Sequence, residues 1–331
     1  MKLRLLLIAT LAFSVNSHSQ PAIKPLDSVL TGFDYPFPVK YFACSIQNQQ
    51  LKMAYMDVAP ATANGKTIVL LHGKNFCGAY FEKVARELSN VGFRIIMPDQ
   101  IGFGKSSKPT SIQFSFQLLA GFTKSLLDSL GVQNVIVLGH SMGGMLATRF
   151  ALMFPERTEK LILEDPLGLE DYKLKVPYAS VDKWFQSEMQ QDYEKLKEYQ
   201  QENYYANTWK PEYDRWVEML AGWTIGPDKE IIARCNALTY DMIFTQPVVY
   251  ELGKLKMPTL LIVGQMDKTA PGKNLVADSV RKTLGNFPAL GKRAQKEIPN
   301  AKLVVIPGVG HLPHLMAFDA FINPLKEFLK Q

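Results

Sequence analysis

A serine in the sequence Gly-His-Ser-Met-Gly at 139–143 stands between a short apolar run and a longer run with helical character. The first run, 135–138, contains three β-branched residues, as a buried strand would. Small residues on both sides of a strand-to-helix turn permit the strained backbone that exposes a serine hydroxyl. The following helix would direct free N–H groups and its positive dipole end at an oxygen that gains negative charge during acyl transfer. The pattern predicts that Ser141 is a nucleophile, with a plain tight turn as the alternative.

A serine hydroxyl reacts well only when a positioned base takes its proton. Apart from one histidine in the first twenty residues, the chain has four: His72, His140, His311 and His314. His140 directly precedes Ser141 and should point away from its hydroxyl. His311 follows a predicted strand in a Gly-His-x-Pro context, and His314 lies three residues beyond. These two are the candidate bases.

The base in turn needs a carboxylate that fixes its tautomer and stabilises the imidazolium. Asp267 follows the predicted strand 259–263, and Asp165 follows the predicted strand 161–163. Either could supply the carboxylate, although Asp165 precedes a proline and could equally start a turn or helix.

The elements that must position these residues are short strands that are apolar on both faces, alternating with helical stretches. This rhythm indicates a mainly parallel sheet covered by helices on both sides, with its chemistry at the carboxyl ends of the strands. The runs 41–46 and 51–58 alternate apolar and polar residues, which predicts an antiparallel pair at the sheet edge. The predicted core strands are 67–71, 93–97, 135–138, 161–163, 259–263 and 303–306.

The alternation stops between residues 166 and 252. This segment holds fifteen aromatic residues, including all four tryptophans, which is well above the 11% average of the chain. Apolar residues recur at helical spacing in three places, at 185–199, 213–220 and 231–242. We therefore expect a cap of three helices that packs mostly on itself and covers an apolar pocket above Ser141.

Taken together, these motifs resemble the α/β-hydrolases, specifically the branch with a serine nucleophile and a helical cap. The resemblance covers about residues 40–331. It implies an α/β-hydrolase fold in which the core is split into 20–165 and 253–331 by the cap at 166–252. Because relatives that remove halogens or open epoxides carry aspartate at the position of Ser141, those two reactions are disfavoured.

The resemblance also orders the candidate site residues. It implies that His72 is structural, that His311 is the base, and that the acid is Asp267, since the order Ser, Asp, His along the chain is typical of this fold. The 44 residues between Asp267 and His311 are somewhat long, and we attribute the excess to a loop at 284–297.

Two backbone N–H groups are expected to bind the oxyanion of the tetrahedral intermediate, those of Met142 and Lys74. Relatives often have an aromatic or small residue in place of Lys74, and its side chain is expected to reach solvent. Asn75 next to it either places an amide near the substrate or stabilises the loop.

The amino-terminal residues and the net charge indicate where the protein is located and which partners it binds. Residues 1–19 combine a basic start, an apolar run and a small-x-small site, the layout of a cleavable secretory signal, and this predicts a periplasmic or secreted protein. Removal of residues 1–19 takes the net charge from +6 to +4, since Lys2 and Arg4 are lost. The remaining charges form no run, so no nucleic-acid partner is expected. With the apolar run removed, no membrane insertion is expected, and residues 20–35 should form an exposed arm.

The three cysteines, Cys44, Cys77 and Cys235, match neither a disulfide scaffold nor a metal site, and buried free thiols are favoured over one bridge. No metal-ligand spacing, phosphate loop or dinucleotide motif occurs, so we expect neither metal nor cofactor. The sequence thus predicts a serine hydrolase that cleaves a small or medium apolar ester. The alternatives are a C–C bond hydrolase, an aminopeptidase, and a non-catalytic carrier of a small ligand.

Overall fold

The apolar runs form one eight-stranded sheet in the computed structural model, which describes residues 22–331. The strand order is β1-β2-β4-β3-β5-β6-β7-β8, in which β2 is antiparallel to both β1 and β4 and all other neighbours are parallel. The predicted antiparallel edge and parallel core are therefore confirmed. The strands are β1 (Val39–Ile46), β2 (Gln49–Val58), β3 (Thr67–Leu71), β4 (Arg94–Pro98), β5 (Val135–His140), β6 (Thr158–Glu164), β7 (Thr259–Gly264) and β8 (Ala301–Ile306).

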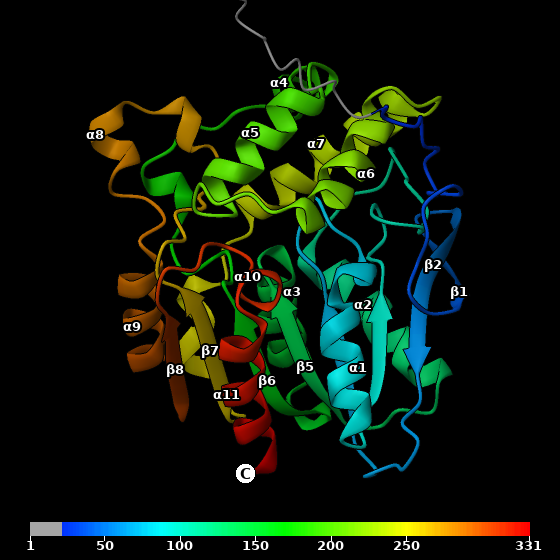
Figure 1. Ribbon diagram of the computed structural model, residues 1–331, viewed down its shortest axis with the longest axis vertical. Helices are drawn as coiled ribbons and strands as arrows, with labels where there is room; N and C mark the ends of the chain where they lie inside the picture. The colour runs from blue at the N-terminus through cyan, green and yellow to red at the C-terminus, as the bar shows by residue number, and fades with distance from the viewer. Residues whose placement is uncertain (1–21) are drawn as a thin grey trace, which may run out of the picture.

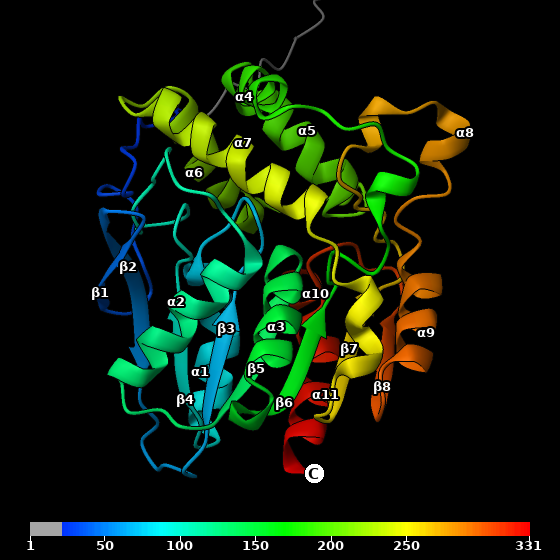
Figure 2. The ribbon, with the colours of Figure 1, turned by 180° about the vertical axis from the view of Figure 1, so that it is seen from behind.

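Helices cover both faces of the sheet because successive residues of the core strands point to opposite sides. In β5, Val135 and Val137 belong to one apolar core, whereas Ile136 and Leu138 belong to the other. One core is closed by α2, α3 and α9, and the opposite one by α1 and α11 (Figures 1 and 2). These helices are α1 (Glu82–Asn90), α2 (Phe116–Ser129), α3 (Met142–Met153), α9 (Phe287–Glu297) and α11 (Phe318–Lys330).

The segment between β6 and β7 forms a helical cap over the carboxyl ends of the parallel strands (Figure 1). It contains four α-helices rather than three, because the expected helix at 185–199 is interrupted. The Asp192 side chain accepts a hydrogen bond from the N–H of Lys195 and so starts a new helix. The cap helices are α4 (Val181–Met189), α5 (Tyr193–Asn203), α6 (Asp214–Thr224) and α7 (Lys229–Thr245).

Short elements complete the described chain. Within residues 22–331, no helix is both long and apolar enough to cross a membrane. The short α-helices are α8 (Asp278–Arg281) and α10 (Pro313–Met316), and the 3₁₀ helices are η1 (Gly78–Phe81), η2 (Pro155–Arg157), η3 (Tyr172–Leu174), η4 (Pro211–Tyr213), η5 (Val249–Lys254) and η6 (Lys273–Leu275).

The amino-terminal segment packs against the cap, so the expectation of an exposed arm is wrong for residues 22–35. Leu26 and Leu30 are buried, and the Leu26 N–H donates to the carbonyl of Gly222 on α6 at 3.0 Å. A Cβ at Gly226 would lie 1.9 Å from the Leu26 carbonyl oxygen, so this close approach requires glycine. The indole N–H of Trp223 donates to the Asp27 carbonyl at 2.9 Å. Two apolar side chains and two backbone contacts thus fix the segment to α6.

The expected loop at 284–297 is also wrong, because most of it is helix α9. The Asn286 side chain caps the helix by accepting from the N–H of Ala289, and proline occupies its first turn. Buried Phe287 and Ala294 hold α9 against the sheet. The chain preceding α9 includes α8, which rises to the level of the cap (Figure 1).

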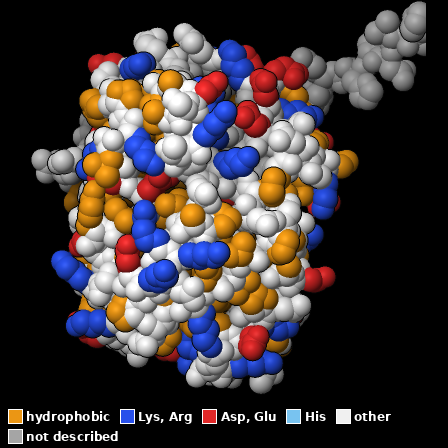
Figure 3. All heavy atoms as spheres, turned by 90° about the vertical axis from the view of Figure 1, so that its left-hand side faces the viewer, with side chains coloured by type: hydrophobic (Ala, Val, Ile, Leu, Met, Phe, Trp, Pro, Cys, Tyr) orange, Lys and Arg blue, Asp and Glu red, His pale blue; other side chains and the backbone are white. Residues whose placement is uncertain are grey.

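The side of the molecule formed by α8, α9 and β8 is rich in basic residues. From Lys268 to Lys302 the sequence contains eight lysines and arginines but only two acids, Asp278 and Glu297. Figure 3 shows Lys and Arg side chains spread over this side.

Candidate active site

Ser141 lies at the turn from β5 into α3 with a strained backbone. Its φ of 58° and ψ of −121° are rarely adopted by residues other than glycine. Backbone hydrogen bonds hold the turn, since the Ser141 N–H donates to Glu164 and the Ser141 carbonyl accepts from Gly144 and Leu167, all at 2.9–3.0 Å. The strand-turn-helix context predicted for Ser141 is therefore present.

Gly143 is required because this turn presses against the end of β3. A Cβ there would lie 2.0 Å from the Leu71 carbonyl oxygen, which is backbone and cannot move aside cheaply. We expect Gly143→Ala to lower the free energy of unfolding by about 3 kcal/mol. Gly121, inside α2 with nothing within 4 Å of its would-be Cβ, is the matched control. At position 121, alanine should raise the free energy of unfolding by about 1 kcal/mol, because alanine has the higher helix propensity. Urea unfolding measures both variants, and a Gly143→Ala variant more stable than Gly121→Ala would contradict the prediction.

Ser141, His311 and Asp267 form one line of hydrogen bonds. The Ser141 Oγ lies 2.8 Å from His311 Nε2, and His311 Nδ1 lies 2.6 Å from Asp267 Oδ2. A carboxylate can only accept, so Nδ1 carries the ring proton and Nε2 is left to accept from the serine hydroxyl. His311 and Asp267 are each only 1% exposed, and the second oxygen of Asp267 accepts from the Thr269 N–H at 2.8 Å.

The His311 loop is held from the cap as well as from the core. The His311 N–H donates to the Tyr204 carbonyl at 2.8 Å, and the two rings stack with centroids 5.1 Å apart. Tyr204 follows α5 directly, and its hydroxyl accepts from the Asn75 side chain at 3.1 Å. Sequence reasoning missed this role, because an aromatic-rich cap gives no sign of which ring will meet the base.

The other two early histidines are buried in structural hydrogen bonds. His140 Nε2 donates to the His311 carbonyl at 2.7 Å, and its Nδ1 accepts from the Tyr80 hydroxyl, which in turn accepts from the Gly73 N–H. His72 Nδ1 donates to the Gly73 carbonyl, and its Nε2 accepts from the Gln100 N–H. Burial lowers the pKa of both imidazoles, and that of His140 is lowered further by neighbouring His311. His140 thus points away from the serine hydroxyl and connects the Gly73 turn to the His311 loop.

His314, the other candidate base, hydrogen-bonds to Glu164 rather than to Ser141. His314 Nδ1 and its backbone N–H both lie within 2.9 Å of Glu164 Oε1, and the ring packs 4.6 Å from Tyr80. No hydrogen bond joins it to Ser141 in the described chain.

The rival acid, Asp165, also does not contact the imidazole of His311. Its carboxyl group accepts from the Gly264 N–H at 2.9 and 3.1 Å and lies close enough to Asp267 to feel its charge. Burial and the adjacent charge of Asp267 raise the pKa of Asp165 well above its ordinary value. The raised pKa favours the protonated, uncharged form of Asp165.

The two residues expected to bind an oxyanion flank the serine. Met142 is the first residue of α3, and the turn containing Lys74 lies against Ser141, since a Cβ on Gly73 would be 2.9 Å from the serine Cβ. Neither the Met142 nor the Lys74 N–H has a hydrogen-bond partner within residues 22–331. The Lys74 side chain does not reach solvent as expected. It forms an ion pair of 3.1 Å with Glu188 of α4 and is 11% exposed.

Ser141 opens into a cavity of about 430 Å³ between the core and the cap. Its walls are aromatic but also charged, so the pocket is less apolar than the sequence led us to expect. The aromatic residues are Trp184, Tyr199, Tyr204 and Tyr240, and the charged ones are Lys74, Glu188, Lys195, Glu202, Lys273 and Arg281.

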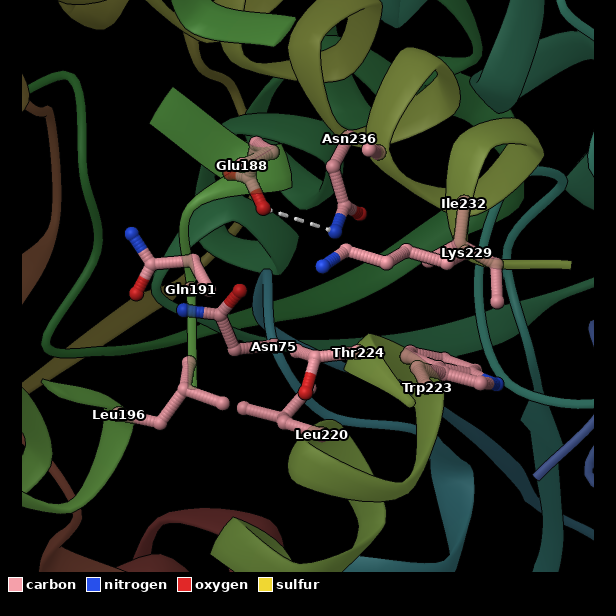
Figure 4. A pocket seen from close by; sticks show the side chains of 11 residues that line it. Asn75, Glu188, Gln191, Leu196, Leu220, Trp223, Thr224, Lys229, Ile232 and Asn236 are labelled. Atoms are coloured by element: carbon pink, nitrogen blue, oxygen red, sulfur yellow. Dashed lines mark hydrogen bonds between the residues drawn. The ribbon is translucent and has the colours of Figure 1, made fainter. Parts of the chain in front are cut away.

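A narrower recess of about 30 Å³ adjoins this cavity and shares Asn75, Glu188, Gln191 and Leu196 with it. Figure 4 shows Glu188 reaching the Asn236 amide, at 3.1 Å, while the Lys229 side chain extends from α7 toward the centre of the recess. Glu188 thus bridges Lys74 of the core and Asn236 of α7 and fixes α4 in place.

The three cysteines are unpaired. Cys77 and Cys235 are buried, and burial raises the pKa of each thiol to about 12. At such values neither thiol is a nucleophile near neutral pH.

Comparisons with known proteins agree with the observed fold. A family model described as alpha/beta hydrolase fold matches residues 66–317. The crystal structure of a probable hydrolytic enzyme from Pseudomonas aeruginosa is 51% identical, with a TM-score of 0.92, and the match covers 93% of this chain and 99% of that one.

More distant relatives act on different bonds. Lipase 1 of Psychrobacter immobilis is 25% identical over 84% of this chain and 80% of its own, and the 2-hydroxy-6-oxo-6-phenylhexa-2,4-dienoate hydrolase of Burkholderia cepacia is 28% identical over 80% and 88%. A local match to a haloalkane dehalogenase of Mycolicibacterium paratuberculosis, 31% identical, spans only 43% of that protein.

Proposed function

The chain belongs to the α/β-hydrolase fold family, and from this membership we propose that it is a serine hydrolase that cleaves a small or medium-sized ester through an acyl-enzyme. The observation that carries the proposal is the unbroken line of hydrogen bonds from Ser141 through His311 to Asp267 at the floor of a cavity. Similarity to a lipase favours the ester bond.

In the proposed reaction, the Ser141 Oγ attacks the ester carbonyl carbon while His311 Nε2 takes the hydroxyl proton. Asp267 stabilises the imidazolium by accepting from Nδ1. The N–H groups of Met142 and Lys74 bind the oxyanion of the tetrahedral intermediate. The intermediate expels the alcohol, which receives the proton from His311. Water, deprotonated by the same nitrogen, then attacks the acyl-enzyme and releases the carboxylic acid.

A fluorophosphonate tests the nucleophile directly. We expect one adduct per chain on Ser141, because the reagent needs a serine activated by a base. Intact-mass measurement followed by peptide mapping would read this out, with Ser187, a second serine lining the cavity, as the internal control. Adducts on Ser187 or on no serine would contradict the proposed mechanism.

The bond type can be separated with a substrate panel. p-Nitrophenyl esters of increasing acyl length, an aminoacyl p-nitroanilide and a vinylogous diketone should rank the ester first. Similarity to the Burkholderia C–C hydrolase makes the diketone the second candidate substrate. Preference for it would replace the ester in the proposal and leave the roles of Ser141 and His311 to be retested.

We further propose that the protein is exported. The signal predicted at 1–19 lies outside the described residues, so the proposal depends on the sequence pattern alone. The intact mass of protein recovered from the periplasm or medium should correspond to a chain starting at Gln20. A mass that includes residues 1–19 would overturn it.

A further inference from the structure

The cavity above Ser141 contains one lysine whose charge is not paired. Four cations line this cavity, and three of them have carboxylate partners. Lys74 pairs with Glu188 at 3.1 Å, Lys195 with Asp192 at 3.0 Å, and Arg281 with Asp278 at 3.2 Å. No ion pair is formed by the fourth, Lys273, within residues 22–331.

The ammonium group of Lys273 makes hydrogen bonds only to neutral oxygens. Its Nζ donates to the side-chain carbonyl of Asn203 and to the backbone carbonyl of Lys268. An ammonium has three donors, so these two acceptors orient the group and leave one N–H for a ligand. Asn203 is itself buried at the end of α5, so the position of the amine is set by the fold.

The charge of Lys273 is also partly shielded from water. Burial lowers the pKa of Lys273, against the influence of the more distant carboxylates of Glu202 and Asp267, which raise it. Glu202 is exposed, so water screens its charge. A desolvated cation without a contacting anion gains more from a bound carboxylate than a cation at the surface would.

The chain around Lys273 carries mostly the same sign of charge. Residues 269–274 and Arg281, which line the cavity, belong to the basic segment that runs from Lys268 to Lys302. This segment covers the side of the molecule seen in Figure 3. A surface of one predominant sign raises the rate at which oppositely charged substrates arrive.

We propose that the natural ester carries a carboxylate, which binds Lys273 while Ser141 attacks the ester carbonyl. The inference rests on the proposed function and adds to it the charge of the substrate. The rings of Tyr199, Tyr204 and Tyr240 line the same cavity and would contact the hydrocarbon between the two groups.

Matched pairs of substrates test the proposal. On the acyl side, p-nitrophenyl hemiesters of succinic, glutaric and adipic acid are compared with their methyl-capped neutral counterparts. On the alcohol side, 4-acetoxybenzoate is compared with its methyl ester. We expect at least one carboxylate to be hydrolysed about 10- to 100-fold better in kcat/KM than its neutral partner, the range of a hydrogen bond to a charged group. This advantage should decline with added salt, and the neutral ester should not respond.

The variants assign the effect to one residue. Lys273→Met should abolish the advantage and leave the rate on neutral esters within about threefold, whereas Lys273→Arg should retain most of it. Lys282→Met is the matched control, because Lys282 is exposed on the same segment and does not line the cavity. Equal melting temperatures would show that the variants are folded.

The outcomes separate this inference from the proposed function. Hydrolysis of neutral esters with no carboxylate preference, or a preference that Lys273→Met leaves intact, overturns the inference and keeps the hydrolase. Absence of both ester turnover and phosphonate labelling overturns the hydrolase itself.

Discussion

Ser141→Ala is expected to lower kcat on the best ester about a million-fold, to the level left by binding and oxyanion contacts alone. The reason is geometric, since the Ser141 Oγ is the atom 2.8 Å from His311 Nε2 and no other described hydroxyl shares that position. Initial rates on p-nitrophenyl esters measure the loss. Ser187→Ala, which changes a serine of the same cavity away from the imidazole, should retain activity within about threefold.

A second comparison shows whether the serine and the histidine act as one unit. His311→Ala should cost as much as Ser141→Ala, and the double variant should cost no more than either, because each change alone breaks the same proton transfer. Additive losses would mean that the two side chains act independently. Full turnover by Ser141→Ala would remove the basis of the mechanism.

Asp267→Asn is expected to lower kcat about ten-thousand-fold, and Asp165→Asn to change it little. Asp267 accepts from His311 Nδ1 with one oxygen and from the Thr269 N–H with the other. An amide in its place can present an N–H to His311 and so favours the wrong tautomer. The raised pKa of Asp165 favours its uncharged form, and an uncharged asparagine can still accept from the Gly264 N–H.

Stability provides the second readout for this pair. The pKa of Asp165 is raised in the folded state above its ordinary value near 3.8. Between these two pKa values the unfolded chain binds fewer protons than the folded one. The free energy of unfolding therefore falls as the pH rises toward the folded-state pKa. Asparagine does not titrate, so Asp165→Asn should keep or raise the melting temperature at pH 7. A large loss of activity in Asp165→Asn with Asp267→Asn nearly intact would exchange the two assignments.

The fold was predictable because its core strands are apolar on both faces, a pattern that only a doubly covered sheet satisfies. Ser141 was predictable for a similar local reason, because the small residues around it are those that the turn needs. The base could be narrowed to two candidates because the chain has few histidines. The family resemblance favoured His311, and the structure agrees, since His314 hydrogen-bonds to Glu164 and His311 to Ser141.

The predictions for Lys74 and for the amino-terminal segment were wrong because each depends on a contact between residues far apart in the chain. Lys74 was expected in solvent because Glu188, its partner, lies 114 residues away on α4. Leu26 was expected to be exposed because nothing near it in sequence shows that it packs against Gly222 of α6 and Gly226 just beyond the helix. The missed helix α9 is different, since Asn286 and the proline two residues later were a readable start signal in the sequence itself.

The attachment of residues 22–35 to α6 limits how far α6 can move away from the narrow recess that its residues Leu220, Trp223 and Thr224 line. Moving α6 away would expose the buried side chains of Leu26 and Leu30, at a free-energy cost of about 1.5–3 kcal/mol for each. The cavity above Ser141 is lined by α4, α5, α7 and residues 269–274 and by no residue of α6, so the attachment does not act on its walls directly. A shortened form that begins beyond Tyr35 would keep every residue of the proposed reaction and lose the contacts that hold α6.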